Sequence, residues 1–68
     1  MLPLFKAGDI VKIKSEYGDI YGIVLYEEFT LSYRLYEIEY LTNHDYWIKD
    51  NGSQGKEEER DLQLISRG

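Results

Sequence analysis

The chain has 68 residues, a net charge of −5 and 15% aromatic side chains, and it contains no cysteine. This length leaves room for one domain, residues 1–68, and the lack of cysteine excludes disulfides and thiolate metal sites. The acidic balance disfavours general binding to the phosphates of nucleic acids.

The predicted elements are β-strands, because apolar and polar side chains alternate with a period near two and no window shows a sustained helical stripe. The first predicted strand covers residues 9–14. Its alternation places Val11 and Ile13 inside and leaves Lys12 and Lys14 in water.

A turn over residues 15–19, where Gly18 can adopt a positive φ angle, leads to a second predicted strand over residues 20–28. Gly22 lies inside this strand and predicts a bulge or a sharp bend there. The third strand, residues 33–41, alternates large apolar side chains with glutamates, so one of its faces is apolar. The side chains predicted to form the inner wall are Tyr36, Ile38 and Tyr40, and those predicted to face water are Glu37 and Glu39.

The C-terminal third carries weaker signals. Residues 45–49 predict a fourth strand between two turns, and residues 53–60 indicate a solvated loop or a ragged edge hairpin. One helical turn over residues 58–61 precedes a short closing strand over residues 61–66. Five short antiparallel strands without a packing helix must curl until the apolar face packs on itself. The predicted fold class is therefore all-β, a single small five-stranded antiparallel barrel.

Four segments carry a resemblance to known barrels: residues 8–13 (GDIVKI), 22–24 (GIV), 36–40 (YEIEY) and 59–65 (ERDLQLI). Their order resembles the SH3-like barrels and is similar to KOW modules and to the small barrel protein of photosystem I. The chain also resembles small uncharacterised proteins of tailed phages, especially those that infect cyanobacteria. The resemblance implies an SH3-like barrel encoded by a phage. It transfers no functional residue, because KOW modules that touch RNA are basic and the photosystem I protein carries a basic docking cluster without an equivalent here.

The sequence contains no pattern that predicts catalysis, a metal site or a cofactor. His44 is the only histidine and indicates a surface turn residue, without the nucleophile and orienting group that a triad needs. The carboxylate runs at residues 27–28 and 57–59 indicate solvated charge rather than acid–base pairs. The segment from Asp50 to Gly55 fits a calcium loop poorly. We therefore expect a protein that is not an enzyme.

The link between the second and third strands is apolar where a loop should be polar, because Phe29, Leu31 and Tyr33 alternate with Thr30 and Ser32. Two interpretations stay open: the tip plugs the barrel, or it projects toward a partner as exposed apolar clusters do. The predicted partner is another protein with a basic surface, attracted by the acidic outer face. The candidate partner-binding residues are Glu27, Glu28, Phe29, Leu31 and Tyr33.

An alternative function is contact with RNA or DNA in transcription or translation. Lys12 and Lys14 share one strand face and, with Trp47, could combine phosphate contacts and base stacking. The simpler interpretation, which we favour, is a charged outer face that keeps the domain soluble and blunts edge pairing.

Two further expectations concern assembly and location. An exposed edge strand could pair two copies of the chain. The longest wholly apolar run, residues 23–26, is too short to span a membrane, and the first residues do not read as a secretory signal. We expect a cytoplasmic protein, in a microbe or an infected host cell, without membrane insertion.

Overall fold

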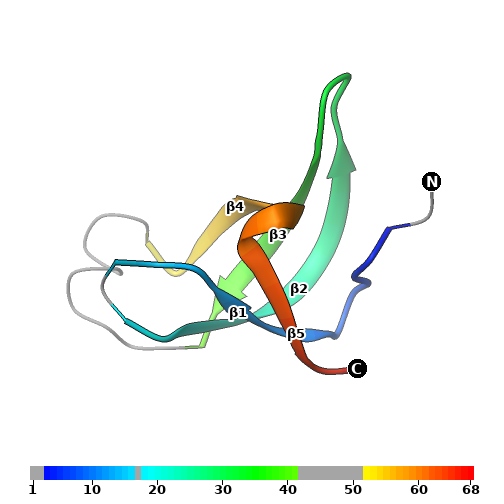
Figure 1. Cartoon of the computed structure of the whole chain (residues 1–68). Coiled ribbons are helices and arrows are strands. Elements are labelled where there is room, and N and C mark those ends of the chain that lie inside the picture. Colours follow the sequence, from blue (N-terminus) through cyan, green and yellow to red (C-terminus); the bar gives the residue numbers. More distant parts are fainter. Residues whose placement is uncertain (1–2, 17, 42–51) are drawn as a thin grey trace.

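Alternating apolar side chains build the central strands of one sheet. The computed structural model describes residues 3–16, 18–41 and 52–68. Its strands are β1 (Ile10–Ile13), β2 (Ile20–Phe29), β3 (Arg34–Tyr40), β4 (Gln54–Glu58) and β5 (Leu62–Ser66), with a 3₁₀ turn η1 (Glu59–Asp61) between the last two. All pairings are antiparallel, in the order β4-β3-β2-β1-β5 (Figure 1). The predicted all-β class with five antiparallel strands is confirmed.

In the C-terminal third, the structure contradicts the loop that was one of two alternatives for residues 53–60 and has an edge strand there. Residues 53–60, predicted as a loop or a ragged edge hairpin, contain β4, which pairs with β3 from Leu35 opposite Glu58 to Glu39 opposite Gln54. The predicted helical turn and the closing strand are confirmed as η1 and β5. The strand predicted over residues 45–49 lies outside the described residues.

Within the described residues, the hydrogen-bonded sheet does not close on itself. Among the described strands, β4 and β5 each pair with one neighbour, so the hydrogen-bonded order ends at these two strands. η1 connects them directly. A closed barrel of the SH3-like kind and the pairing of two copies through an edge therefore stay predictions.

The predicted inner wall is confirmed, because Tyr36, Ile38 and Tyr40 are all buried. Of the two glutamates between them, Glu37 is half-buried and Glu39 is exposed. Phe5, which precedes β1, packs its ring edge-on against Tyr36, with 5.3 Å between ring centroids and 81° between ring planes. The remaining buried apolar side chains are Val11, Ile13, Ile20, Val24 and Leu62. The core is thus completed by an N-terminal aromatic residue and not by the link at residues 29–33.

Gly22 serves close packing instead of a bulge. A Cβ atom at this position would lie 2.2 Å from Cγ2 of Ile38 and 3.1 Å from the carbonyl oxygen of Glu39. The register of β2 against β3 shifts between Val24 and Tyr26, not at Gly22. The predicted bulge at Gly22 is therefore wrong, because the glycine is required by the close approach of β3, whereas the alternative of a sharp bend at Gly22 stays a prediction. The positive φ angle predicted for Gly18 is confirmed, at 104°.

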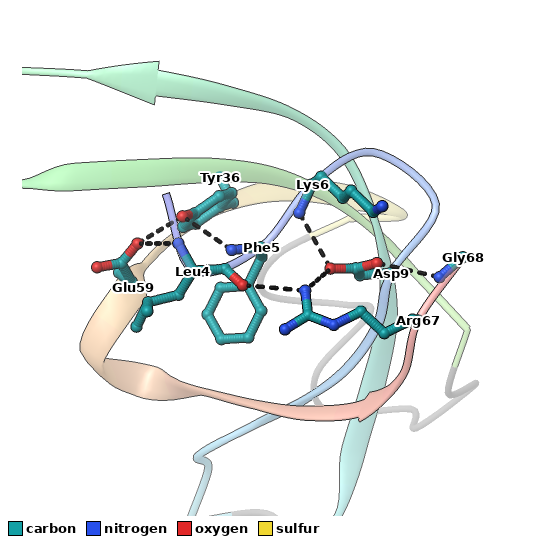
Figure 2. Close-up of polar contacts among 8 residues, drawn as sticks. All are labelled: Leu4, Phe5, Lys6, Asp9, Tyr36, Glu59, Arg67 and Gly68. Carbon is teal, nitrogen blue, oxygen red and sulfur yellow. Dashed lines mark hydrogen bonds and ion pairs between the residues drawn. The ribbon is translucent and has the colours of Figure 1, made fainter. Parts of the chain in front are cut away.

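A buried carboxylate fastens the N-terminal segment to the last residues (Figure 2). Asp9 is 0% exposed and accepts hydrogen bonds from the backbone N–H groups of Lys6 and Gly68, both at 3.0 Å. Nη1 of Arg67 lies 3.2 Å from the same carboxylate. These donors, the N–H of Gly68 foremost, outweigh the effect of burial and lower the pKa of Asp9. The carboxylate is therefore ionised at neutral pH and ties together segments that are far apart in the sequence.

Candidate functional site

The β2–β3 hairpin ends in a short turn that one side chain holds in place. Thr30 donates twice to the carbonyl oxygen of Tyr33, from its backbone N–H at 2.9 Å and from its hydroxyl at 2.7 Å. The same hydroxyl oxygen accepts the N–H groups of Tyr33 at 3.0 Å and of Ser32 at 3.3 Å. A threonine that bonds to nearby backbone in this way stabilises a tight turn. The backbone that carries Leu31 is thereby fixed.

The apolar side chains of the turn are exposed. Leu31 is fully exposed, Phe29 is 68% exposed and Tyr33 is 49% exposed. Figure 1 shows the hairpin of β2 and β3 projecting beyond the rest of the sheet. The interpretation that this link plugs a barrel is therefore wrong, and its apolar side chains lie in water. Residues 29–33 are called the tip from here on.

Charged pairs hold the strands next to the tip. Nε of Arg34 lies 2.7 Å from Oε2 of Glu27, and Cζ of Arg34 lies 5.4 Å from the ring centre of Phe29. Glu28 forms an ion pair with Lys56 of β4, at 2.8 Å between Oε2 and Nζ. Both glutamates that the sequence assigned to partner binding thus have a cationic neighbour within the chain. Their contribution to partner binding stays a prediction.

Glu59 of η1 links the core to the N-terminal segment (Figure 2). Its Oε2 accepts the hydroxyl of Tyr36 at 2.5 Å and the backbone N–H of Leu4 at 3.2 Å. Nη1 of Arg34 lies 3.9 Å from the same oxygen. Burial of Tyr36, together with the bond to Glu59, raises the pKa of this phenol to about 12. The phenol therefore stays neutral and donates to a partly buried carboxylate.

Glu57 of β4 repeats this arrangement with a second tyrosine. Its Oε2 accepts the hydroxyl of Tyr40 at 2.5 Å. Partial burial raises the pKa of Glu57, the charge of Asp61 adds to the rise, and the bond from Tyr40 opposes it. The interpretation of residues 57–59 as solvated charge is therefore wrong for Glu57 and Glu59. Tyrosines predicted on the inner face were the available signal, since a buried hydroxyl requires an acceptor.

A surface pocket of about 210 Å³ lies between the tip and η1. It is lined by Tyr33, Arg34, Glu58, Glu59 and Arg60. Nη2 of Arg60 lies 3.2 Å from Oε2 of Glu58, and the side chain of Arg60 is 80% exposed. The sequence did not predict this pocket, because its two halves meet only through the pairing of β3 with β4 and the turn of η1.

One of the two lysines predicted to contact nucleic acid has an acidic partner. Nζ of Lys12 lies 3.0 Å from Oδ1 of Asp19, and this hydrogen bond raises the pKa of Lys12. Lys14 is exposed just after β1, whereas Trp47 and His44 lie outside the described residues. A function with RNA or DNA stays a prediction.

The described part of the chain contains no group of three or more His, Asp or Glu side chains that could hold a metal ion. Within the same ranges, no helix has the length and apolarity needed to cross a membrane. No protein-family model, no curated protein and no solved structure matches this chain. The exposed tip and the adjacent pocket are thus the features on which a functional proposal can be built.

Proposed function

We propose that this chain is a protein-interaction or assembly module without enzymatic activity, and that it binds a partner protein through the tip. The observation that supports this best is the fully exposed Leu31 on a turn that Thr30 holds by hydrogen bonds. Binding through a turn that is already ordered loses less conformational entropy than binding through a flexible loop.

The apolar content of the tip is sufficient to anchor an interface. Fully burying a side chain such as leucine or phenylalanine contributes about 1.5–3 kcal/mol. Phe29, Leu31 and Tyr33 lie within five consecutive residues, and two of them are aromatic. A few apolar and aromatic side chains near the centre of an interface usually contribute most of its binding free energy.

The charge of the chain defines the kind of partner. A net charge of −5 on 68 residues attracts a basic surface and repels an acidic one. Glu27 and Glu28 are already paired with Arg34 and Lys56. The attraction therefore comes from the whole chain rather than from these two carboxylates alone.

We further propose that residues 1–68 form a single SH3-like barrel that presents the tip. The strand order β4-β3-β2-β1-β5 and the 3₁₀ turn between β4 and β5 support this, together with one continuous core on the inner face. The resemblance to small proteins of tailed phages is the ground for proposing a phage-encoded assembly role.

The test replaces Leu31 by aspartate. Leu31→Asp is expected to keep the circular-dichroism spectrum and the urea midpoint of the wild type, because the side chain contacts water in the free protein. It is expected to abolish binding to the protein that the wild type captures from a host lysate, measured with both proteins purified. Binding should be lost because the interface would have to bury an unpaired carboxylate at its centre, which costs free energy.

The matched control is Leu41→Asp, which makes the same change at a half-exposed leucine just after β3. This variant is expected to bind like the wild type, since the tip is at the other end of β3. A folded Leu31→Asp protein that binds with unchanged affinity would contradict the proposed function.

A further inference from the structure

We infer that the pocket between the tip and η1 receives one arginine or lysine side chain of the partner, and that Arg60 is the cation that this side chain displaces. The inference rests on the proposed function, because it specifies how the same surface recognises a basic protein. The pocket of about 210 Å³ has the size for one side chain and not for a peptide.

The pocket supplies acceptors for a cation. Glu58 and Glu59 both line it, and the contacts of Glu59 with Tyr36, Leu4 and Arg34 all use Oε2. With respect to the described residues, Oε1 of Glu59 therefore keeps lone pairs for a further donor. A guanidinium placed between the two carboxylates would satisfy both of them.

The wall toward the tip suits the same ligand. Tyr33 lines the pocket and also belongs to the exposed apolar group of the tip. The face of a tyrosine ring attracts a guanidinium or an ammonium group, and more strongly when the site is desolvated. A partner that covers the tip would desolvate the pocket at the same time, so the two contacts belong to one interface.

The two arginines of the pocket differ in how firmly they are held. Arg34 is 12% exposed and lies 2.7 Å from Glu27, with Phe29 beside its guanidinium. Arg60 is 80% exposed and, among the described residues, has one ion pair, with Glu58 two residues away. An exposed ion pair of this kind is weak, because both charges remain hydrated. Arg60 can therefore leave, whereas Arg34 remains part of the wall.

The charges favour a cationic occupant over an anionic one. Arg34 faces the carboxylates of Glu27 and Glu59, so its positive charge is compensated by the protein itself. Departure of Arg60 then leaves the carboxylate of Glu58 without its cation. An anion would have to enter this site against the net charge of −5.

The experiment titrates ¹⁵N-labelled protein with N-acetyl-arginine amide, and separately with acetate, and follows amide shifts of residues 33–34 and 58–60. Arg60→Ala is expected to bind the arginine probe up to about fivefold more tightly than the wild type, because the competing cation is gone. Lys14→Ala removes the same charge at an exposed site after β1 and should leave the affinity within experimental error. Glu58→Gln should lower the affinity for the arginine probe.

Weaker binding of the arginine probe by Arg60→Ala, or shifts at these residues with acetate alone, would overturn the inference. Equal affinities of Arg60→Ala and Lys14→Ala would do the same. Leu31→Asp separates this inference from the proposed function, since it should bind the arginine probe normally and fail to bind the partner protein. If the arginine probe does not bind to the pocket but Leu31→Asp still fails to bind the partner protein, the inference is contradicted and the proposed function is not.

Discussion

At the scale of single residues, the buried hydroxyl of Tyr36 makes hydrogen bonds that the apolar core around it cannot replace. It donates to Glu59 and accepts the backbone N–H of Phe5 at 3.4 Å. Tyr36→Phe keeps the ring but leaves both partners with one bond fewer. We expect a loss of about 1–2 kcal/mol in the free energy of unfolding, measured by urea denaturation with an unchanged m-value.

The control for this prediction is Tyr26→Phe. The hydroxyl of Tyr26 donates to Glu37 at 3.3 Å on a half-exposed side chain, where water replaces a lost bond. This variant should be as stable as the wild type. Equal losses in the two variants would show that burial of the Tyr36 hydroxyl does not matter.

Asp9 makes stability depend on pH. Its pKa is lowered in the folded protein from an ordinary value of 3.8, chiefly by the N–H of Gly68, so the unfolded chain takes up the proton at a higher pH. The stabilisation is complete above that ordinary value and disappears as the pH falls through the folded pKa. Asp9→Asn should lower the urea midpoint at pH 7 and flatten its dependence between about pH 5 and pH 2. If the urea midpoints of the variant and the wild type fall in parallel as the pH is lowered, this role of Asp9 is contradicted.

At the scale of elements, strands with an apolar alternation could be predicted, whereas the charged strand could be predicted only as one of two alternatives, an edge hairpin or a loop. β1, β2 and β3 follow a period of two that fits a half-buried strand. β4 has the sequence QGKEE, without an apolar side chain, so its conformation depends on pairing with β3 and on the bond between Tyr40 and Glu57. These contacts are distant in sequence, and local propensity gives no sign of them.

The candidate site also has one part that could be predicted from the sequence and one part that could not. The tip was predictable because Phe29, Leu31 and Tyr33 are apolar in a segment that connects two strands. The projection of the tip into solvent was not predictable, because it depends on Phe5, and not the tip, filling the core. The pocket was not predictable, because Tyr33 and Arg60 approach each other only after β4 pairs and η1 turns.

The rigidity of the tip can be tested at Thr30. Thr30→Val keeps the shape of the side chain and removes the hydroxyl that bonds to Ser32 and Tyr33. Amide hydrogen exchange of Tyr33 should accelerate by about tenfold, as expected for a loss of about 1.4 kcal/mol in local opening free energy. The urea midpoint should change little, because the turn is exposed. Ser32→Ala is the control, and unchanged exchange in Thr30→Val would indicate that the backbone alone fixes the turn.

At the scale of the whole molecule, a small core has to oppose a large surplus of negative charge. The ion pairs of Lys12 with Asp19, Lys56 with Glu28 and Arg60 with Glu58 are at least partly exposed. Such pairs contribute little to stability because their charges remain hydrated, and they leave the net charge of −5 unchanged. Repulsion among the remaining carboxylates therefore lowers the stability of the compact state.

The combined substitution Glu16→Lys and Glu39→Lys tests this repulsion. Both side chains are exposed and form no ion pair within the described residues. Each substitution changes the charge by two units, so the net charge moves from −5 to −1. The variant should be more stable than the wild type by roughly 0.5–1 kcal/mol at about 10 mM salt, and the difference should vanish near about 1 M, where charges are screened over about 3 Å. Lys14→Glu should shift stability in the opposite direction with the same salt dependence; a stability gain that persists at high salt would assign the effect to strand propensity rather than to charge.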